Sequence, residues 1–186
     1  MLIITDQNFE ETISKSDRPV LVDFWGSYCN PCHVLSQILE KISEEFEGKI
    51  IFAKANVDEV PKISQKFGID RIPTVILFQE GKPTSGFFGV RPESIIRDWL
   101  KENLLIKEYE DYAKKNGLKL NPNQEVIQRL IKGLLENEKK YGERYCPCRK
   151  VTGNLEEDKG KICPCELHRE EIESNGHCLC GLFFRE

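Results

Sequence analysis

Residues 20–32 read VLVDFWGSYCNPC, and this stretch decides the fold of the first half of the chain. Its first six residues are mostly aliphatic or aromatic, which is typical of a buried β-strand. Apolar residues then recur at helical spacing from Val34 to Phe46. The sequence therefore predicts a strand that leads directly into a helix, with Cys29 and Cys32 where that helix begins.

A Cys-x-x-Cys pair in this strand-to-helix context is a redox motif. The helix dipole and free amides favour a thiolate at the first position, so the pKa of Cys29 can lie near ~7 instead of ~8.5. Cys32, one turn into the helix, can then resolve a mixed disulfide. The competing interpretation is zinc binding, but no second ligand pair lies nearby in the sequence.

Further strands and helices are predicted along the first half. Strand signals return at residues 50–57 and 74–78, and Gly81 marks a turn into a last strand near Phe87. Apolar residues between 95 and 104 then line one face of a closing helix. Strands alternating with helices and ending in a hairpin predict an α/β domain, with a mixed central sheet flanked by helices.

The first half resembles thioredoxin from residue 1 to about residue 106. The motifs that carry the resemblance are Val22-Asp23-Phe24-Trp25, the Cys29/Cys32 pair, Val57-Asp58 and Ile72-Pro73-Thr74. The resemblance implies that Asp23 is a buried carboxylate that moves a proton to or from the second cysteine, and that Pro73 is a cis proline beside the disulfide. Burial raises the pKa of a carboxyl, and a cis proline exposes backbone with which a client chain can pair.

Three positions depart from the thioredoxin pattern. Asn30 replaces the usual Gly between the cysteines, Tyr28 stands in place of a Trp, and Gln37 occupies the place of a helix-kinking Pro. We expect them to shift redox potential or partner choice and to leave the chemistry in place. A structural role for Asp23 stays open, and His33 is expected at an exposed helix position.

The bulk composition excludes several classes of protein. In 186 residues, 27 Lys and Arg stand against 31 Asp and Glu, which predicts neither nucleic-acid nor membrane binding. The start has no signal-peptide pattern, and no run approaches the ~20 apolar residues that span a membrane, so we expect a cytoplasmic protein. Eight cysteines in such a chain favour catalytic or metal-binding roles over structural disulfides.

A domain boundary is predicted after residue 106, where the sequence becomes charged and poor in large apolar residues. We therefore expect domains at 1–106 and 107–186. Two alternatives stay open for the connection: the chain bends there, or the closing helix continues as a stiff connector as far as Gly117.

The second domain is predicted to be small and mainly α-helical. A helix is expected from the N-cap Asn121, with Pro122 at its first position, to Gly142. Beyond Gly142 the apolar content is too thin for a conventional core, so we expect a metal centre to organise this part.

Six cysteines of the second half form three Cys-x-Cys pairs: Cys146/Cys148, Cys163/Cys165 and Cys178/Cys180. A structural zinc uses four ligands, commonly in pairs with wider spacing. A four-iron cluster also takes four thiolates, which leaves two cysteines for a disulfide beside it. An iron-sulfur redox site is the favoured interpretation, and a zinc-stabilised structural or docking module is the alternative.

The second half resembles the catalytic subunit of ferredoxin:thioredoxin reductase. The resemblance is carried by Tyr112-Ala113, Ile131-Lys132-Gly133-Leu134, Tyr141-Gly142, the three Cys-x-Cys pairs and Leu182-Phe183-Phe184. It implies a 4Fe-4S cluster on four of the cysteines, namely Cys146, Cys163, Cys165 and Cys178. Cys148 and Cys180 would form the active disulfide, with Cys148 attacking the thioredoxin disulfide and Cys180 next to the cluster.

One histidine of that family is missing here, because Leu179 stands between the last two cysteines. His177 is our candidate for the missing proton donor, although an ordinary surface position is the competing interpretation. His168 is expected to be structural or exposed.

Together the two resemblances imply a relay from ferredoxin, through the cluster and the Cys148–Cys180 disulfide, to Cys29 and Cys32 and on to client proteins. Other thioredoxins are further candidate partners. Transfer within one chain and transfer between the chains of a homodimer both stay open. In the zinc alternative, an external reductase reduces the thioredoxin-like domain.

Overall fold

The computed structural model describes residues 1–186, which form two compact units, Met1–Arg97 and Asp98–Glu186. The units divide inside helix α4 (Glu93–Lys115). Leu105, Tyr109 and Ala113 of α4 are buried in the core of the second unit. The closing helix therefore continues without a break, as the second alternative predicted.

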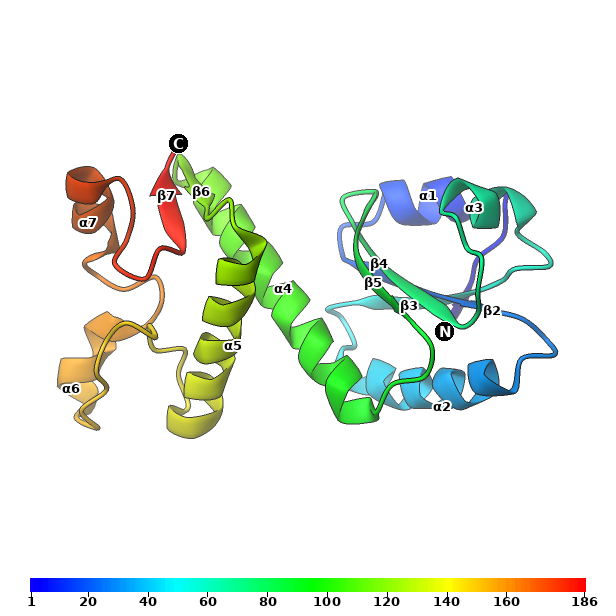
Figure 1. The fold of residues 1–186 in the computed structure, drawn as a ribbon, viewed down its shortest axis with the longest axis horizontal. Helices are drawn as coiled ribbons and strands as arrows, with labels where there is room; N and C mark the ends of the chain where they lie inside the picture. The colour runs from blue at the N-terminus through cyan, green and yellow to red at the C-terminus, as the bar shows by residue number, and fades with distance from the viewer. The chain divides into compact units, whose positions relative to one another are not determined.

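The first unit is built on a five-stranded mixed sheet in the order β1-β3-β2-β4-β5. β3 runs parallel to β1 and β2, whereas β4 runs antiparallel to β2 and β5. Helices α1 and α3 lie on one face of the sheet and α2 on the other (Figure 1). The elements are β1 (Leu2–Ile3), α1 (Phe9–Ser14), β2 (Val20–Trp25), α2 (Asn30–Glu45), β3 (Ile51–Asn56), α3 (Pro61–Lys66), β4 (Thr74–Gln79) and β5 (Lys82–Phe88). The predicted α/β fold with a mixed sheet is confirmed.

The two faces of β2 have different tasks, because successive side chains of a strand point to opposite faces. Val20, Val22 and Phe24 are buried in the core that also contains residues of α1 and α3. Asp23 points to the other face, where its carboxylate meets Ser36 of α2. The central strand thus places one acidic side chain beneath the helix that begins at the cysteine pair.

Helix α2 begins directly after Cys29, whose Sγ caps the helix by accepting a hydrogen bond from the N–H of Cys32 at 3.2 Å. Its buried face consists of Cys32, Leu35, Leu39 and Ile42, at the spacing that keeps side chains on one side of a helix. Burial of this stripe fixes the helix on the sheet and holds the cysteine pair at the carboxyl end of β2.

The second unit contains the rest of α4 and mostly short elements. They are β6 (Leu118–Leu120), α5 (Gln124–Tyr141), α6 (Leu155–Asp158), the 3-10 helix η1 (Lys159–Lys161), α7 (His168–Asn175) and β7 (Phe183–Arg185), with β6 and β7 paired antiparallel. Cys163, Ile172, Cys178, Leu182 and Phe183 share one core with α4 and α5. The chain beyond Gly142 therefore joins an apolar core through its cysteines as well as its aliphatic residues.

The C-terminal end of α5 lies where it was predicted, whereas the predicted N-cap is wrong. Gly142 ends the helix in the left-handed conformation, with φ 84°. The N-cap is Asn123 instead of Asn121, and its side chain accepts a hydrogen bond from the N–H of Glu125 at 2.9 Å. Asn121 is engaged elsewhere, since its Nδ2 donates to the carbonyl of Gly181 at 2.7 Å.

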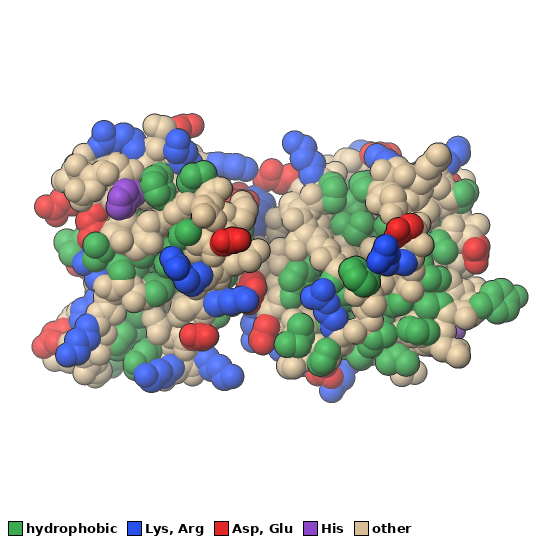
Figure 2. Space-filling view, in the orientation of Figure 1, with side chains coloured by type: hydrophobic (Ala, Val, Ile, Leu, Met, Phe, Trp, Pro, Cys, Tyr) green, Lys and Arg blue, Asp and Glu red, His purple; other side chains and the backbone are tan.

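Charges are interspersed over the surface. On the face shown in Figure 2, Lys and Arg side chains alternate with Asp and Glu on both units, as the near balance of 27 basic and 31 acidic residues leads one to expect. None of the helices combines the length with the apolar character that crossing a membrane requires.

Candidate functional site

The first candidate site is the disulfide between Cys29 and Cys32, with sulfur atoms 2.05 Å apart. Cys29 is partly exposed at the N-terminus of α2, whereas Cys32 is fully buried. An incoming thiolate therefore has access to Cys29, whereas Cys32 is shielded from it.

Asp23 is an ionisable group beneath helix α2, the helix that begins at this disulfide, and its side chain is fully buried. Its Oδ2 accepts a hydrogen bond from the hydroxyl of Ser36 at 2.9 Å, and its Oδ1 has no partner. Burial raises the pKa of Asp23 to about 6, against the opposing effects of Ser36 and of Lys54 on the neighbouring strand β3. A carboxyl with this pKa can take up or release a proton near neutral pH.

Replacing Ser36 by alanine is expected to raise the pKa of Asp23 above its value of about 6. The hydroxyl donates to the carboxylate and so favours the charged form, and alanine removes that donor. Carbon-13 NMR of the Asp23 carboxyl during a pH titration measures the change. The matched control is Ser43→Ala on the same helix, since that hydroxyl bonds to the carbonyl of Glu40. An unchanged pKa in Ser36→Ala would contradict the assignment.

The stability of the fold should follow the same proton. The pKa of Asp23 lies above its ordinary value of 3.8, so the folded chain holds this proton where the unfolded chain has lost it. The stabilisation is complete below 3.8 and is lost as the pH rises through about 6. In Ser36→Ala this loss should extend to higher pH.

Three further residues of the predicted first site have the following surroundings. The Ile72–Pro73 peptide bond is cis, and the Pro73 carbonyl accepts a hydrogen bond from Gly89 at 2.9 Å. Tyr28 is fully exposed beside Cys29. His33 is exposed, as expected, and its Nε2 lies 3.2 Å from the carbonyl of Ser27.

The second candidate site is a pocket lined by all six remaining cysteines. Each pair comes from a different part of the chain: the segment after α5, the segment after η1 and the segment after α7. Four thiols are buried and two are only half-buried. The buried ones are Cys146, Cys163, Cys165 and Cys178, and the half-buried ones are Cys148 and Cys180.

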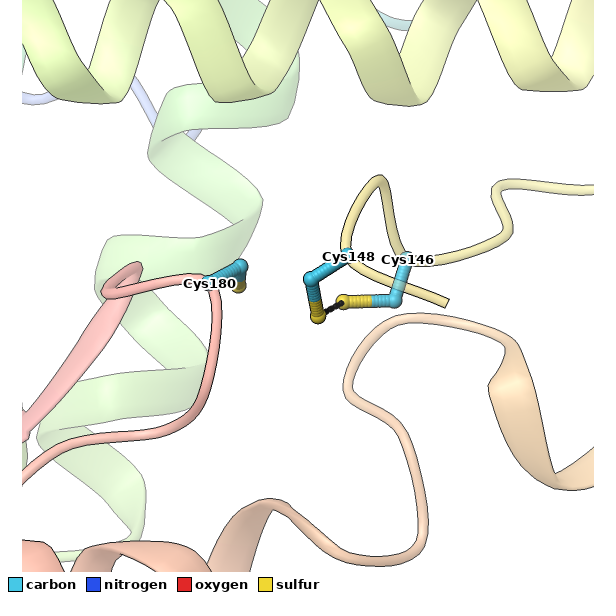
Figure 3. Close-up of side chains that lie close together, drawn as sticks. All are labelled: Cys146, Cys148 and Cys180. Atoms are coloured by element: carbon cyan, nitrogen blue, oxygen red, sulfur yellow. Dashed lines mark hydrogen bonds between the residues drawn. The ribbon is translucent and has the colours of Figure 1, made fainter. Parts of the chain in front are cut away.

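Short sulfur–sulfur distances occur within two of the pairs. Cys146 and Cys148 have sulfur atoms 3.2 Å apart, and those of Cys178 and Cys180 are 3.6 Å apart. Figure 3 shows that Cys180 reaches the Cys146/Cys148 turn from a separate loop, and the three sulfur atoms lie within 4.8 Å of one another. The fold thus brings the first and third Cys-x-Cys pairs into one thiol cluster.

The thiols perturb one another. Hydrogen bonds to Cys163 and Cys165 raise the pKa of Cys146, whereas hydrogen bonds from Cys146 and Cys178 lower the pKa of Cys180 to about 3. The pKa of Cys165 is lowered to about 6 by Cys146 and by the guanidinium of Arg149. The cluster therefore mixes donor thiols with acceptor thiolates, and a bound metal would displace the remaining protons.

The donor set of this pocket fits a thiophilic metal centre. Thiolates are soft ligands that select zinc, copper(I) and iron-sulfur clusters. Four buried sulfurs match the four thiolates of a cluster, and the two half-buried sulfurs remain for exchange with other thiols. The trio Cys146, Cys148 and Cys180, whose sulfur atoms lie close enough to share a metal ion, contains one buried and two half-buried cysteines. Burial and distance therefore group the six thiols in two different ways.

Two histidines near the pocket differ in their surroundings. His168 is buried and lines the pocket, with its Nδ1 2.6 Å from the carbonyl of Cys165 and its Nε2 2.7 Å from the hydroxyl of Tyr112. Both ring nitrogens therefore have hydrogen-bond partners, and a structural role for His168 stays a prediction. His177 is exposed, its Nδ1 lies 2.9 Å from the carbonyl of Cys178, and it is not among the lining residues. Its role as proton donor stays a prediction.

Sequence reasoning missed Arg149 and Glu171. Arg149 follows Cys148 directly, and its Nη2 lies 3.9 Å from the sulfur of Cys165. Glu171 lines the pocket from α7 and forms an ion pair with Arg149. The only sequence signal for them is a basic residue next to a cysteine and an acidic residue one turn after His168.

Comparisons with known proteins match both halves of the chain. The thioredoxin family model matches residues 1–102, and the family model described as ferredoxin thioredoxin reductase catalytic beta chain matches residues 100–186. A thioredoxin of Rickettsia bellii is 44% identical over 101 residues, which are 54% of this chain and 96% of that protein. A thioredoxin of Chlorobaculum thiosulfatiphilum is 42% identical over 100 residues, 54% of this chain and 93% of that protein. Both predicted resemblances are confirmed.

Proposed function

This chain belongs to the thioredoxin family over its first half and continues into a domain of the ferredoxin thioredoxin reductase catalytic type, and from this premise we propose that it is a ferredoxin-dependent disulfide reductase with two centres. Disulfide oxidoreductase chemistry follows from both domains. The finer proposal is a relay in which the thiol pocket receives electrons and the Cys29/Cys32 pair delivers a dithiol to client proteins. The observation that carries it is the single pocket with four buried and two half-buried thiols.

We assign the four buried cysteines, Cys146, Cys163, Cys165 and Cys178, as ligands of a 4Fe-4S cluster. Such a cluster supplies electrons one at a time, as a ferredoxin does. Cys148 and Cys180 are assigned as the redox pair, because their half-buried sulfurs remain accessible to another disulfide. The domain limits of the relay are proposed at 1–106 and 107–186.

The exchange step needs only the thiols of the chain. The Cys148 thiolate attacks the sulfur of Cys29, so a Cys148–Cys29 bond forms and the Cys29–Cys32 bond breaks. The released Cys32 thiolate takes the proton of Asp23. Cys180 then attacks Cys148 and releases Cys29, which leaves the pocket pair oxidised by two electrons and the Cys29/Cys32 pair reduced by two. Two electrons from ferredoxin and two protons restore the pocket dithiol.

The direction of this transfer is favourable. A plant-type ferredoxin near about −400 mV and a thioredoxin pair near about −270 mV differ by about 130 mV, or roughly 6 kcal/mol for two electrons. If the linked domains reach each other, the tether gives an effective concentration of about mM. Transfer between two chains of a dimer gives the same products, and a rate that depends on protein concentration would identify it.

The second candidate function is a thioredoxin with a zinc-stabilised docking domain. Its support is the trio Cys146, Cys148 and Cys180, which lies within metal-binding distance but divides the buried and half-buried sets. In that case the Cys29/Cys32 pair depends on an external reductase, and ferredoxin has no effect.

The relay is tested with the full chain and reduced ferredoxin under anaerobic conditions. Alkylation and mass spectrometry follow the free thiols of Cys29 and Cys32 with time. We expect reduction in the wild type and a loss of about 100-fold or more in rate in Cys148→Ser, since its nucleophile is absent. Dithiothreitol should still reduce Cys29–Cys32 in that variant, which controls for folding. Equal ferredoxin-driven rates in both chains would contradict the relay.

A further inference from the structure

A carboxylate on α7 contacts the neighbours of both half-buried cysteines. Glu171 pairs through Oε1 with the guanidinium Nη2 of Arg149, the residue directly after Cys148. Its Oε2 accepts a hydrogen bond from the backbone N–H of Leu179, directly before Cys180, at 2.8 Å. One carboxylate therefore bridges the two segments that carry Cys148 and Cys180.

The backbone hydrogen bonds of the cysteine pairs lead to other segments. The N–H of Cys146 donates to the carbonyl of Lys161 at 2.8 Å, and this bond joins the first pair to the segment of the second. The N–H of Cys178 donates to the carbonyl of Phe183 at 3.0 Å, which ties the third pair to β7. Besides the contacts among the sulfur atoms themselves, a hydrogen-bonded link between the first and third pairs passes through Glu171.

The Arg149–Glu171 ion pair is largely shielded from solvent. Both side chains are about four-fifths shielded, with relative exposures of 19% and 18%. The guanidinium of Arg149 is charged, since arginine does not lose its proton in proteins. Charge-assisted hydrogen bonds of this kind are roughly twice as strong as neutral ones and strongly directional.

We propose that Glu171 is a positioning residue that holds Cys148 and Cys180 together as the redox pair of the pocket, with Arg149 as its partner. This inference rests on the proposed assignment of that pair. Holding both segments raises the effective concentration of one thiol toward the other and so favours their disulfide. In the measured reaction, Cys148 and Cys180 form one S–S bond and lose two S–H bonds, while one oxidised glutathione gains two electrons and becomes two reduced glutathiones.

The test equilibrates the metal-loaded full chain with glutathione mixtures, followed by acid quenching, alkylation and peptide mass spectrometry of the Cys148–Cys180 disulfide. Glu171→Ala should lower the equilibrium constant for that disulfide about tenfold, because two hydrogen bonds to a charged group are lost. The equilibrium constant of Glu171→Gln should lie between that of the wild type and that of Glu171→Ala. The matched control is Glu170→Ala, an exposed acid on the same helix, and it should match the wild type.

Arg149→Gln separates positioning from a simple charge effect. If Arg149 acted only as a cation that stabilises thiolates, its removal would make the disulfide more favourable. If it belongs to the Glu171 bridge, its removal should make the disulfide less favourable, as in Glu171→Ala. Metal content is measured in every variant, and only variants that retain the wild-type content are compared.

The outcomes separate this inference from the proposed function. A wild type that forms no Cys148–Cys180 disulfide at any glutathione ratio overturns the assignment of the redox pair. A wild-type disulfide whose equilibrium constant is unchanged in Glu171→Ala and in Glu171→Gln overturns the positioning role alone. An increased constant in Arg149→Gln does the same.

Discussion

Replacing Cys29 by serine should lower the rate at which the full chain reduces protein disulfides by roughly 10³-fold or more. The reason is that a covalent mechanism cannot proceed without its nucleophile. Cys29 carries the accessible sulfur of its pair, whereas Cys32 is fully buried. The measurement is the rate of insulin disulfide reduction with dithiothreitol as the source of electrons. This source bypasses the thiol pocket, so the result reports on the first centre alone.

Cys32→Ser is the informative comparison for that variant. Here Cys29 can still attack, but the buried resolving thiol is gone, so a stable mixed disulfide with the client should accumulate. Circular dichroism of both variants checks that the fold is kept. Activity retained in Cys29→Ser, or a mixed disulfide trapped on Cys32 instead, would contradict the assigned roles.

The second large effect is expected at the thiol pocket, where Cys146→Ala should remove most of the bound metal and Cys148→Ala should retain it. The two cysteines are separated by one residue, and their sulfur atoms lie 3.2 Å apart, so they form a matched pair. Cys146 is buried among the other cysteines that line the pocket, whereas Cys148 is half-buried. Loss of one of four thiolate ligands leaves an incomplete centre.

The measurement is the iron and zinc content of anaerobically purified variants. We expect less than about a tenth of the wild-type metal in Cys146→Ala, since an incomplete ligand set loses its coupling to folding. Equal loss in both variants would instead support a site made by the trio Cys146, Cys148 and Cys180. Loss confined to Cys148→Ala would reverse the proposed division between ligands and redox pair.

The first half of the molecule could be predicted from sequence because local signals and tertiary packing agree there. Residues 20–25 form a central strand whose inner side chains are buried, and the cysteine pair follows at the helix start as expected.

In the second half, the N-cap of α5 lies two residues after the predicted one, because Asn121 and Asn123 are both good caps. A contact from Asn121 to Gly181 decides between them. That contact joins segments far apart in sequence, so no local pattern contains it.

The thiol pocket was predictable in its members and unpredictable in its arrangement. The three Cys-x-Cys pairs predicted a metal centre, but which cysteines are buried depends on how three loops fold around the pocket. The bridge from Arg149 through Glu171 to Leu179 depends on the same loops. His168 lines the pocket, whereas His177 does not. Their positions follow from the fold, since His168 is the first residue of α7, and the two side chains are chemically identical.

Metal and acid-labile sulfide analysis of the anaerobically purified full chain, with its visible absorption spectrum, tests the central claim most directly. The relay requires about four irons and four sulfides per chain and a broad brown absorption, as for a cluster held by four thiolates. A colourless protein with about one zinc per chain would contradict it and leave the cysteine-rich domain as a structural or docking module.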